Sequence, residues 1–221
     1  MDYLEAMTAR HSVRSYENRP LPPEIVGELE RQIEEINAQS GLHIQLVTNE
    51  PKAFDSAMAH YGKFSGVTNY FALVGKKGPA LEESCGYYGE KLVLAAQAMG
   101  LNTCWVALTF KKVPGAYTVE KGEKLLLVIA LGYGKTQGAA HRSKAPEELA
   151  DLKNDAPAWF SDGVKAAALA PTAVNQQKFR FFYDNGKVAA EAGRGFYTKT
   201  DLGIAKLHFE LGAGKGKDIW K

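Results

Sequence analysis

The chain has 221 residues, of which 45% are hydrophobic, 24% charged and 10% aromatic. This balance is that of an ordinary globular protein, and it excludes a disordered, fibrous or membrane-spanning chain. The 27 lysines and arginines exceed the 25 aspartates and glutamates by only two, and they are spread along the sequence. A protein that binds the nucleic-acid backbone normally carries more positive charge than this, so we expect no nucleic-acid partner.

Cysteine usage and the N-terminal residues favour a cytoplasmic location. Cys85 and Cys104 lie too far apart for a CxxC motif, and we expect both to be buried, reduced thiols. The opening residues carry acid where a signal peptide carries base, and the longest unbroken apolar run, Leu125 to Leu131, is too short to span a bilayer. We therefore predict a cytoplasmic protein without a membrane partner.

The hydrophobic pattern predicts helices and strands in alternation. Leu21-Pro22-Pro23-Glu24 is a helix-start signal, because proline is tolerated in the first turn, and the amphipathic helix that follows ends near Ser40-Gly41. The residues from Cys85 to Met99 are apolar on most sides, which is typical of a buried central helix. The predicted helices cover residues 2–9, 24–40, 85–99, 158–169 and 202–211, and the predicted strands cover 42–47, 69–74, 103–106, 124–131 and 178–183.

The remaining segments are predicted to be loops and turns. Residues 132–146 form a glycine-rich loop, and Asp184-Asn185-Gly186 is a turn signal. Residues 214–221 are expected to form a loosely held tail. A helix followed by a strand occurs over 24–47 and again over 158–183, an internal echo that duplication or chance explains equally well.

Arg10, Ser12 and Arg14 stand at alternate positions of an irregular polar segment. In an extended conformation alternate side chains point the same way, so two guanidinium groups and a hydroxyl can meet one phosphate or another anion. A solvated polar loop is the alternative explanation.

The run from Gly132 to Thr136 ends in Gly-Lys-Thr, as a nucleotide-binding P-loop does. A P-loop also needs a glycine five places earlier, where this chain has Ile129 inside a predicted strand. We therefore reject an NTPase. Arg142 and Lys144, further along the same loop, are either anion ligands or solvated loop charges.

The segment from Ala170 to Phe179 lies between a predicted helix and a predicted strand and reads Ala-Pro-Thr-Ala-Val-Asn-Gln-Gln-Lys-Phe. Its Thr, Asn and Gln side chains offer both donors and acceptors, as the edge of a uracil-like ring requires. The other explanation is a capping and turn segment that follows a helix ended by Pro171.

Residues 100–108 carry small or apolar side chains, which leave backbone N–H groups free to meet a planar ligand, although a buried strand has the same composition. Neither cysteine has a neighbouring base in the sequence, so neither is predicted to be a nucleophile. The five histidines show no metal-ligand spacing, and no metal site is predicted.

Taken in this order, the segments resemble the FMN-dependent nitroreductase family. Residues 10–14 look like its N-terminal flavin-binding signature, and residues 90–105 are similar to its central helix and following strand. Residues 127–133 with Arg142 look like its late strand and basic loop, and residues 170–179 resemble its Ala-Pro-Ser-x-x-Asn-x-Gln-Pro-Trp element. The resemblance implies an α+β fold with a central, mainly antiparallel sheet flanked by helices.

The order of these segments departs from that of ordinary family members, in which the Pro-Ser-x-x-Asn element follows the first long helix. Here that place holds Asn37 to His43, and the element comes at residues 171–177. This relocated order resembles a branch described as nitroreductases or BluB-like flavoproteins. It implies that residues 151–221 complete in cis a flavin site begun by a nitroreductase-like part, residues 1–150, so that one compact chain forms a pseudo-dimer with one flavin.

The resemblance also implies which residues bind the flavin. Arg10, Ser12 and Arg142 would hold the FMN phosphate, with His11 beside it and Arg14 near the N1/O2 edge of the ring. The ring and ribityl chain would be lined by Pro171, Thr172, Asn175 and Gln177, and the backbone N–H groups of Ala107 and Leu108 would approach N5 and O4.

The implied activity is that of an NAD(P)H-dependent oxidoreductase in which the flavin, and no catalytic side chain, carries out the redox chemistry. NADH or NADPH would reduce FMN and leave, and a nitroaromatic, a quinone or a similar small acceptor would follow. A BluB-like enzyme that fragments the flavin with oxygen, and a flavin-binding sensor or store without turnover, are the alternatives. The sequence has no Rossmann G-x-G-x-x-G, so any nicotinamide would use the flavin pocket itself. We expect a self-sufficient monomer or a homodimer.

Overall fold

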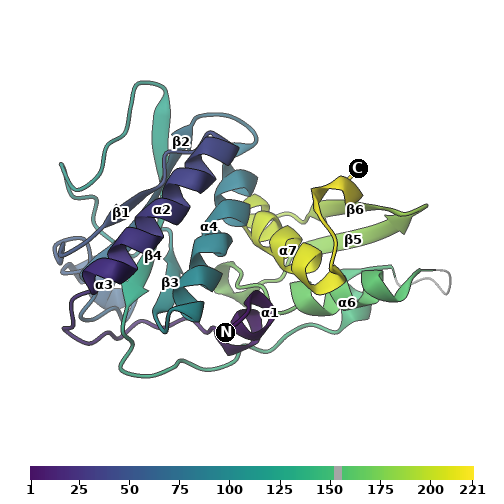
Figure 1. The fold of residues 1–221 in the computed structure, drawn as a ribbon, viewed down its shortest axis with the longest axis horizontal. Coiled ribbons are helices and arrows are strands. Elements are labelled where there is room, and N and C mark those ends of the chain that lie inside the picture. Colours follow the sequence, from purple (N-terminus) through teal and green to yellow (C-terminus); the bar gives the residue numbers. More distant parts are fainter. Residues whose placement is uncertain (152–155) are drawn as a thin grey trace. The chain divides into compact units, whose positions relative to one another are not determined.

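A computed structural model describes residues 1–151 and 156–221 of the chain (Figure 1). These residues divide into two compact units. The first unit consists of residues 9–81 and 92–139 together with Met1, and the second of residues 2–8, 82–91 and 140–221. No helix in the described ranges is long and apolar enough to cross a membrane.

The first unit is built around a four-stranded sheet and the second around a β-hairpin. The first unit contains α2 (Pro23–Ser40), β1 (Gln45–Val47), α3 (Ala57–Tyr61), β2 (Asn69–Lys76), β3 (Asn102–Val106) and β4 (Glu123–Gly132). The second unit contains most of α1 (Tyr3–Ala9), α5 (Pro146–Leu149), α6 (Ala158–Ala167), the short helix η1 (Ala173–Asn175), β5 (Phe179–Asp184), β6 (Lys187–Ala192), α7 (Thr198–Ala213) and the short helix η2 (Lys217–Ile219). Helix α4 (Leu81–Ala98) contributes residues to both units. The predicted boundary between residues 150 and 151 adjoins residues 152–155, which lie outside the described residues.

The sheet of the first unit is antiparallel, with the strand order β1-β2-β4-β3. In the centre, Ala130 of β4 pairs with Tyr70 of β2 on one side and with Cys104 of β3 on the other. The predicted α+β class with an antiparallel sheet is therefore confirmed. Because β3 is an edge strand, its free edge can receive another segment, and Ser12 forms a parallel bridge with Thr103 there.

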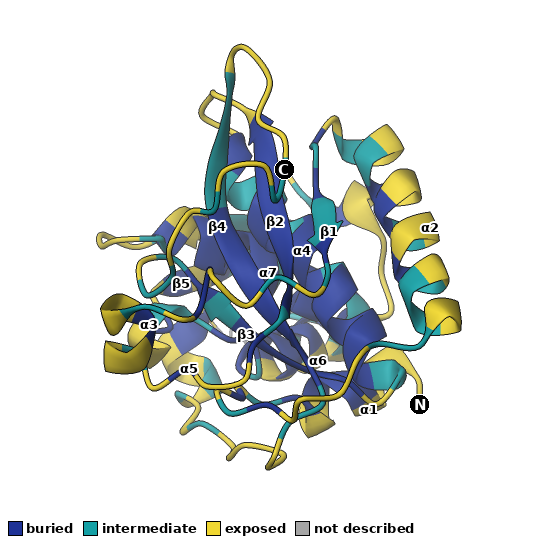
Figure 2. Cartoon of the chain, turned by 90° about the vertical axis from the view of Figure 1, so that its left-hand side faces the viewer, coloured by how far each residue is buried: buried dark blue, intermediate teal, exposed yellow. Residues whose placement is uncertain are grey.

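Both faces of the sheet are buried, as the apolar strands predicted (Figure 2). Tyr70 and Ala72 belong to a cluster on one face that also holds Phe54 and Phe64, which flank α3 between β1 and β2. Phe71 stands at the alternating position, so it points to the opposite face, and it is also fully buried. Complete burial of one large apolar side chain stabilises the fold by about 1.5–3 kcal/mol. The sheet is therefore the core of the first unit.

Helix α2 has the amphipathic form that its sequence predicted. Leu29, Ile33 and Ile36 are buried along one side, and the other side is exposed (Figure 2). The helix ends before Gly41, whose φ of 69° lies in the left-handed region that glycine adopts without strain.

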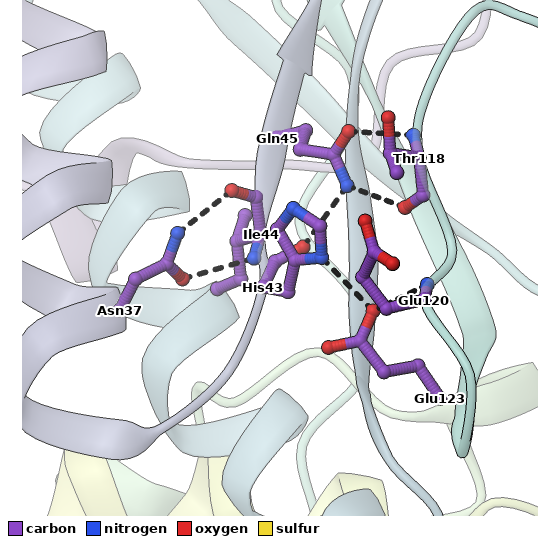
Figure 3. Close-up of polar contacts among 7 residues, drawn as sticks. All are labelled: Asn37, His43, Ile44, Gln45, Thr118, Glu120 and Glu123. Carbon is purple, nitrogen blue, oxygen red and sulfur yellow. Dashed lines mark hydrogen bonds and ion pairs between the residues drawn. The ribbon is translucent and has the colours of Figure 1, made fainter.

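The first strand is shorter than the predicted range 42–47, because the side-chain amide of Asn37 takes the backbone hydrogen bonds of Ile44 (Figure 3). The amide of Asn37 donates to the carbonyl of Ile44 and accepts from its N–H, both at 2.9 Å. Gln45 makes the same two-way contact with the backbone of Thr118, at 2.8 and 2.7 Å. The backbone groups of Ile44 are thus taken by the Asn37 side chain, and only residues 45–47 continue as a strand.

The second unit contains an antiparallel hairpin of β5 and β6. The turn between these strands lies at Asn185 and Gly186, which both have positive φ values, of 49° and 82°. Such values suit a two-residue hairpin turn, so the predicted turn is confirmed. Strand β6 is absent from the sequence predictions, because its run of Ala and Glu has little intrinsic preference for strands.

Two short helices, α3 and α5, are also absent from the predictions. They have five and four residues, too few to show a helical period. Each is set by a local cap: the hydroxyl of Ser56 accepts from the Ala59 N–H at 3.2 Å, and the carboxylate of Glu148 accepts from the Ala145 N–H at 3.0 Å.

Residues 214–221 do not form a loose tail, so that prediction is wrong. The indole N–H of Trp220 donates to the carboxylate of Glu210. Its ring centroid lies 5.4 Å from that of Phe209 and 6.1 Å from that of Phe181. The glycine- and lysine-rich composition suggested mobility, but aromatic packing within the second unit holds the segment.

Helices α4 and α7 cross at two glycines within the second unit. A Cβ atom at Gly203 would lie 2.1 Å from the carbonyl oxygen of Glu83, and one at Gly86 would lie 2.0 Å from the carbonyl oxygen of Thr200. The two backbones therefore touch, and no side chain fits between them.

We expect Gly203→Ala to lower the free energy of unfolding by about 3 kcal/mol, in the upper part of the range for overpacked sites, because the obstructing atoms belong to a backbone. Gly27→Ala is the matched control. Nothing lies within 4 Å of a Cβ at Gly27, which stands on the exposed side of α2. Alanine there should raise the free energy of unfolding by about 0.8–1 kcal/mol. Urea unfolding measures both changes, and equal effects would contradict the close crossing.

Candidate functional site

The segment after α1 carries three of the predicted anion ligands in the first unit. Arg10 is only 5% exposed, and its Nε atom has no hydrogen-bond partner among the residues that the structure describes. Ser12 and Arg14 are exposed, and His11 is half-buried. The segment is held against β3, since the Val13 N–H donates to the Thr103 carbonyl at 3.0 Å.

Arg10, Ser12 and Arg14 all lie near enough to the thiol of Cys104 on β3 to lower its pKa. Burial raises the pKa of Cys104, while the charges of Arg14 and Arg10 and a hydrogen bond with the Ser12 side chain act in the opposite direction. Burial prevails, so the thiol stays protonated at neutral pH and is a poor nucleophile. The fold thus brings these three alternate side chains to one place.

The glycine-rich loop approaches the same segment through its backbone. A Cβ atom at Gly138 would lie 2.8 Å from the Cβ of His11 and 3.1 Å from the carbonyl oxygen of Ser12. Gly138 also has a φ of 74°, which favours glycine. Closer to β4, the N–H of Gly134 donates to the Asn102 side chain at 2.9 Å. These glycines allow close packing within the protein, as expected if the loop is not a P-loop.

Ala107 and Leu108 directly follow the end of β3 in the first unit. Ala107 is half-buried, whereas Leu108 is 68% exposed, which is unusual for a large apolar side chain beside a buried strand. The end of β3 therefore presents an apolar surface.

The predicted amide-rich segment forms a strained turn in the second unit. Pro171 and Thr172 lead into it, and Val174, Asn175 and Gln177 have φ values of 45°, 55° and 45°. For a β-branched residue such as Val174 this conformation is an outlier, and strain of this kind costs about 1–3 kcal/mol. The Val174 side chain is 81% exposed, so its own burial does not compensate for the strain.

Side-chain amides hold this turn against the loop that carries Arg142. The buried amide of Gln177 donates to the Arg142 carbonyl and to the Asn175 side chain, both at 2.9 Å, and accepts from the Lys144 N–H at 2.8 Å. The Asn175 amide also donates to the Arg142 carbonyl, at 3.0 Å. The hydroxyl of Thr172 accepts from the Gln177 N–H at 3.0 Å. Arg142, Thr172, Asn175 and Gln177 are therefore brought together.

Asp201 on α7 is a further residue of this turn, and sequence reasoning missed it. Its two carboxylate oxygens accept from the Ala173 N–H at 3.0 Å and from the Gln176 amide at 2.7 Å. The residue is 3% exposed, and burial raises its pKa from the ordinary 3.8 to about 6, against the lowering effect of both hydrogen bonds. The predicted helix began at residue 202, so no sequence pattern pointed to this carboxylate.

We expect Asp201 to make the protein less stable as the pH rises from about 4 to 6. Because the pKa is higher in the folded state, that state binds more protons in this window, and the stabilisation that protonation provides is lost as the carboxyl ionises. A shift from 3.8 to about 6 corresponds to roughly 3 kcal/mol. Asp201→Asn removes this titration, so the stability difference between wild type and variant should fall by that order between pH 4 and pH 7. Urea unfolding at both pH values tests this, and a difference independent of pH would contradict it.

The comparisons with known proteins agree with this fold. The family model described as "Putative TM nitroreductase" matches residues 2–213, so the chain belongs to this nitroreductase family. No curated protein matches the chain.

Solved structures show the same architecture. The chain is similar to a "putative nitroreductase" of Thermotoga maritima, with 22% identity, a TM-score of 0.68 and coverage of 96% of this chain and 83% of that one. It is similar to a nitroreductase-like protein of Streptococcus mutans, with 15% identity, a TM-score of 0.54 and coverage of 69% and 98%. It is also similar to a protein of Parabacteroides distasonis named "Putative NADH dehydrogenase/NAD(P)H nitroreductase", with 22% identity, a TM-score of 0.52 and coverage of 69% of this chain and 97% of that one. At these identities the likeness is one of fold, and it confirms the predicted nitroreductase-like fold.

Proposed function

We propose that this chain binds FMN and uses NADH or NADPH to reduce electron-poor acceptors such as nitroaromatics and quinones in a ping-pong cycle. The observation that carries the proposal is the buried guanidinium of Arg10, whose Nε has no acceptor among the described residues. Leaving a buried donor unpaired costs about 1–3 kcal/mol, and more for a charged group. A phosphate oxygen would pair it through a strong, charge-assisted hydrogen bond.

The residues proposed to bind the phosphate are Arg10 and Ser12, with His11 beside them, and Arg142 of the glycine-rich loop. Chain connectivity supports the participation of Arg142. It follows Gly138 by four residues, and four residues of chain span at most about 14 Å. Gly138 packs against His11, so the basic loop begins next to the proposed phosphate.

The proposed ring site combines Arg14, Ala107 and Leu108 with the turn of the second unit. The turn residues in this site are Pro171, Thr172, Asn175 and Gln177. Two observations support the idea that this turn replaces an element placed earlier in ordinary nitroreductases. The amide of Asn37, which stands at the earlier place, both donates to and accepts from the backbone of Ile44. The later turn is strained, as is common for segments that bind a ligand.

FMN, when bound, would supply the redox chemistry, taking a hydride from the reduced nicotinamide and delivering electrons to the acceptor. The residues of the chain would bind and orient it. Arg14 would place a positive charge near the pyrimidine edge and so favour the electron-rich form. The exposed side chain of Leu108 would offer an apolar contact to a planar acceptor. In this scheme no side chain has to transfer a proton.

The absorption spectrum of the purified protein tests the proposal, together with the ratio of flavin to chain. We expect a yellow protein that holds close to one FMN per chain and oxidises NADH or NADPH when a quinone or nitroaromatic is added. A colourless protein that takes up no added FMN would refute the proposal. Formation of dimethylbenzimidazole from reduced FMN in air would instead identify a flavin-fragmenting enzyme, and a stable yellow protein without turnover would identify a sensor or store.

Arg10→Gln should weaken FMN binding roughly tenfold to a hundredfold, because it removes one charge-assisted hydrogen bond worth about 1.5–3 kcal/mol. The same substitution should leave the flavin-free protein as stable as wild type or more so, since an unpaired buried donor disappears. Arg31→Gln, on the exposed side of α2, is the control for charge. Fluorescence titration with FMN measures the affinity, and thermal unfolding without FMN measures the stability. A large loss of stability with unchanged FMN affinity would show that Arg10 is only structural.

A further inference from the structure

A groove of about 390 Å³ lies in the second unit, on the β5–β6 hairpin. This volume is within the range of small-molecule sites. The groove is lined by Lys144, Glu148, the run Gln177 to Arg180, and the run Glu191 to Arg194.

The lining of the groove is positively charged. Lys144, Lys178, Arg180 and Arg194 stand against two acids, Glu148 and Glu191. No ion pair joins any of these four cations to a carboxylate within the described part of the chain.

Each of the two acids of the groove already faces a partner. Glu148 accepts the Ala145 N–H and so caps α5. Glu191 stands directly opposite Arg180 in the hairpin, where opposite charges compensate each other. With four cations and two carboxylates the lining keeps a formal net charge of +2, and Lys178, Arg194 and Lys144 form no ion pair among the described residues.

Backbone carbonyls orient two of the three remaining cations. The ammonium of Lys144 donates to the Gln177 carbonyl at 3.0 Å, and that of Lys178 donates to the Arg194 carbonyl at 3.2 Å. An ammonium has three donors, so each keeps two for a ligand. The guanidinium of Arg194 is exposed, and the wall beside it consists of Gly193 and Ala192, whose small side chains leave room.

We propose that this groove binds phosphate groups of the dinucleotide reductant. The inference rests on the proposed function, which requires NADH or NADPH to reach the flavin. Lys144 and Gln177 belong both to the groove and to the strained turn, and they are joined by the hydrogen bond from the Lys144 N–H to the Gln177 side chain. A dinucleotide whose nicotinamide lies at the flavin beside this turn would reach the groove with its phosphates. Guanidinium and ammonium groups without carboxylate partners are suited to phosphate.

The direct test is calorimetric titration with adenosine 2′,5′-bisphosphate, which needs neither flavin nor turnover. We expect wild type to bind this probe, and Arg194→Gln and Lys178→Gln each to weaken it tenfold or more, the effect of one charge-assisted hydrogen bond. Lys165→Gln is the matched control, because Lys165 is exposed on α6 and pairs with Asp162 outside the groove. The control should bind within twofold of wild type. Arg194→Lys, which keeps the charge, should recover part of the affinity.

Steady-state kinetics with the flavin-loaded protein identify the phosphate concerned. A rise in KM for NADPH alone in Arg194→Gln would assign the groove to the 2′-phosphate, and an equal rise for NADH and NADPH would assign it to the shared pyrophosphate. Both results support the proposal. Wild type that binds no bisphosphate, or groove variants that bind it as the control does, would overturn it. The proposed function fails separately, since a protein that takes up no FMN can still bind the bisphosphate through Arg194.

Discussion

The parallel bridge between Ser12 and Thr103 holds the basic N-terminal segment against an edge strand whose other side is already paired. The position of the basic segment depends on this edge strand. Buried side chains on both faces keep the sheet rigid, and the bridge fixes the direction of the segment along it. Arg10, Ser12 and Arg14 all act on the Cys104 thiol for this reason, although an irregular segment free in solution would not hold them near it.

A second constraint operates in the turn of the second unit. Left-handed backbone at Val174 and Gln177 is unfavourable, and it persists because the surrounding hydrogen bonds leave no alternative. The amide of Gln177 makes three hydrogen bonds on one side of the turn, and the carboxylate of Asp201 accepts two on the other. Holding a strained turn by buried polar groups sets its shape before a ligand arrives, which reduces the ordering that binding requires.

The two units contribute different chemistry to the proposed function. The first supplies cationic groups and an unpaired buried donor, which suit a phosphate. The second supplies a preformed polar turn and, beside it, a groove with an excess of positive charge. Cofactor and reductant both carry phosphates, so a modest net charge of +2 is compatible with two local concentrations of positive charge.

The sequence by itself determined the features that depend on near neighbours. The apolar period of α2, the buried runs of β2 and β4, and the Asn185-Gly186 turn were all predicted correctly, because side-chain spacing and turn chemistry act over a few residues. The basic, apolar and amide-rich segments together also sufficed to identify the nitroreductase family, which the match over residues 2–213 confirms.

Only the tertiary structure decided what depends on distant residues. It showed that Asn37 shortens β1, that Trp220 packs on Phe209, and that Asp201 supports a turn 25 residues away at Gln176. The tertiary structure alone also showed that the Arg10 Nε is unpaired and that the groove has an excess of positive charge. The physical reason is that burial and hydrogen-bond satisfaction are properties of a packed environment, and residues far apart in the chain create that environment.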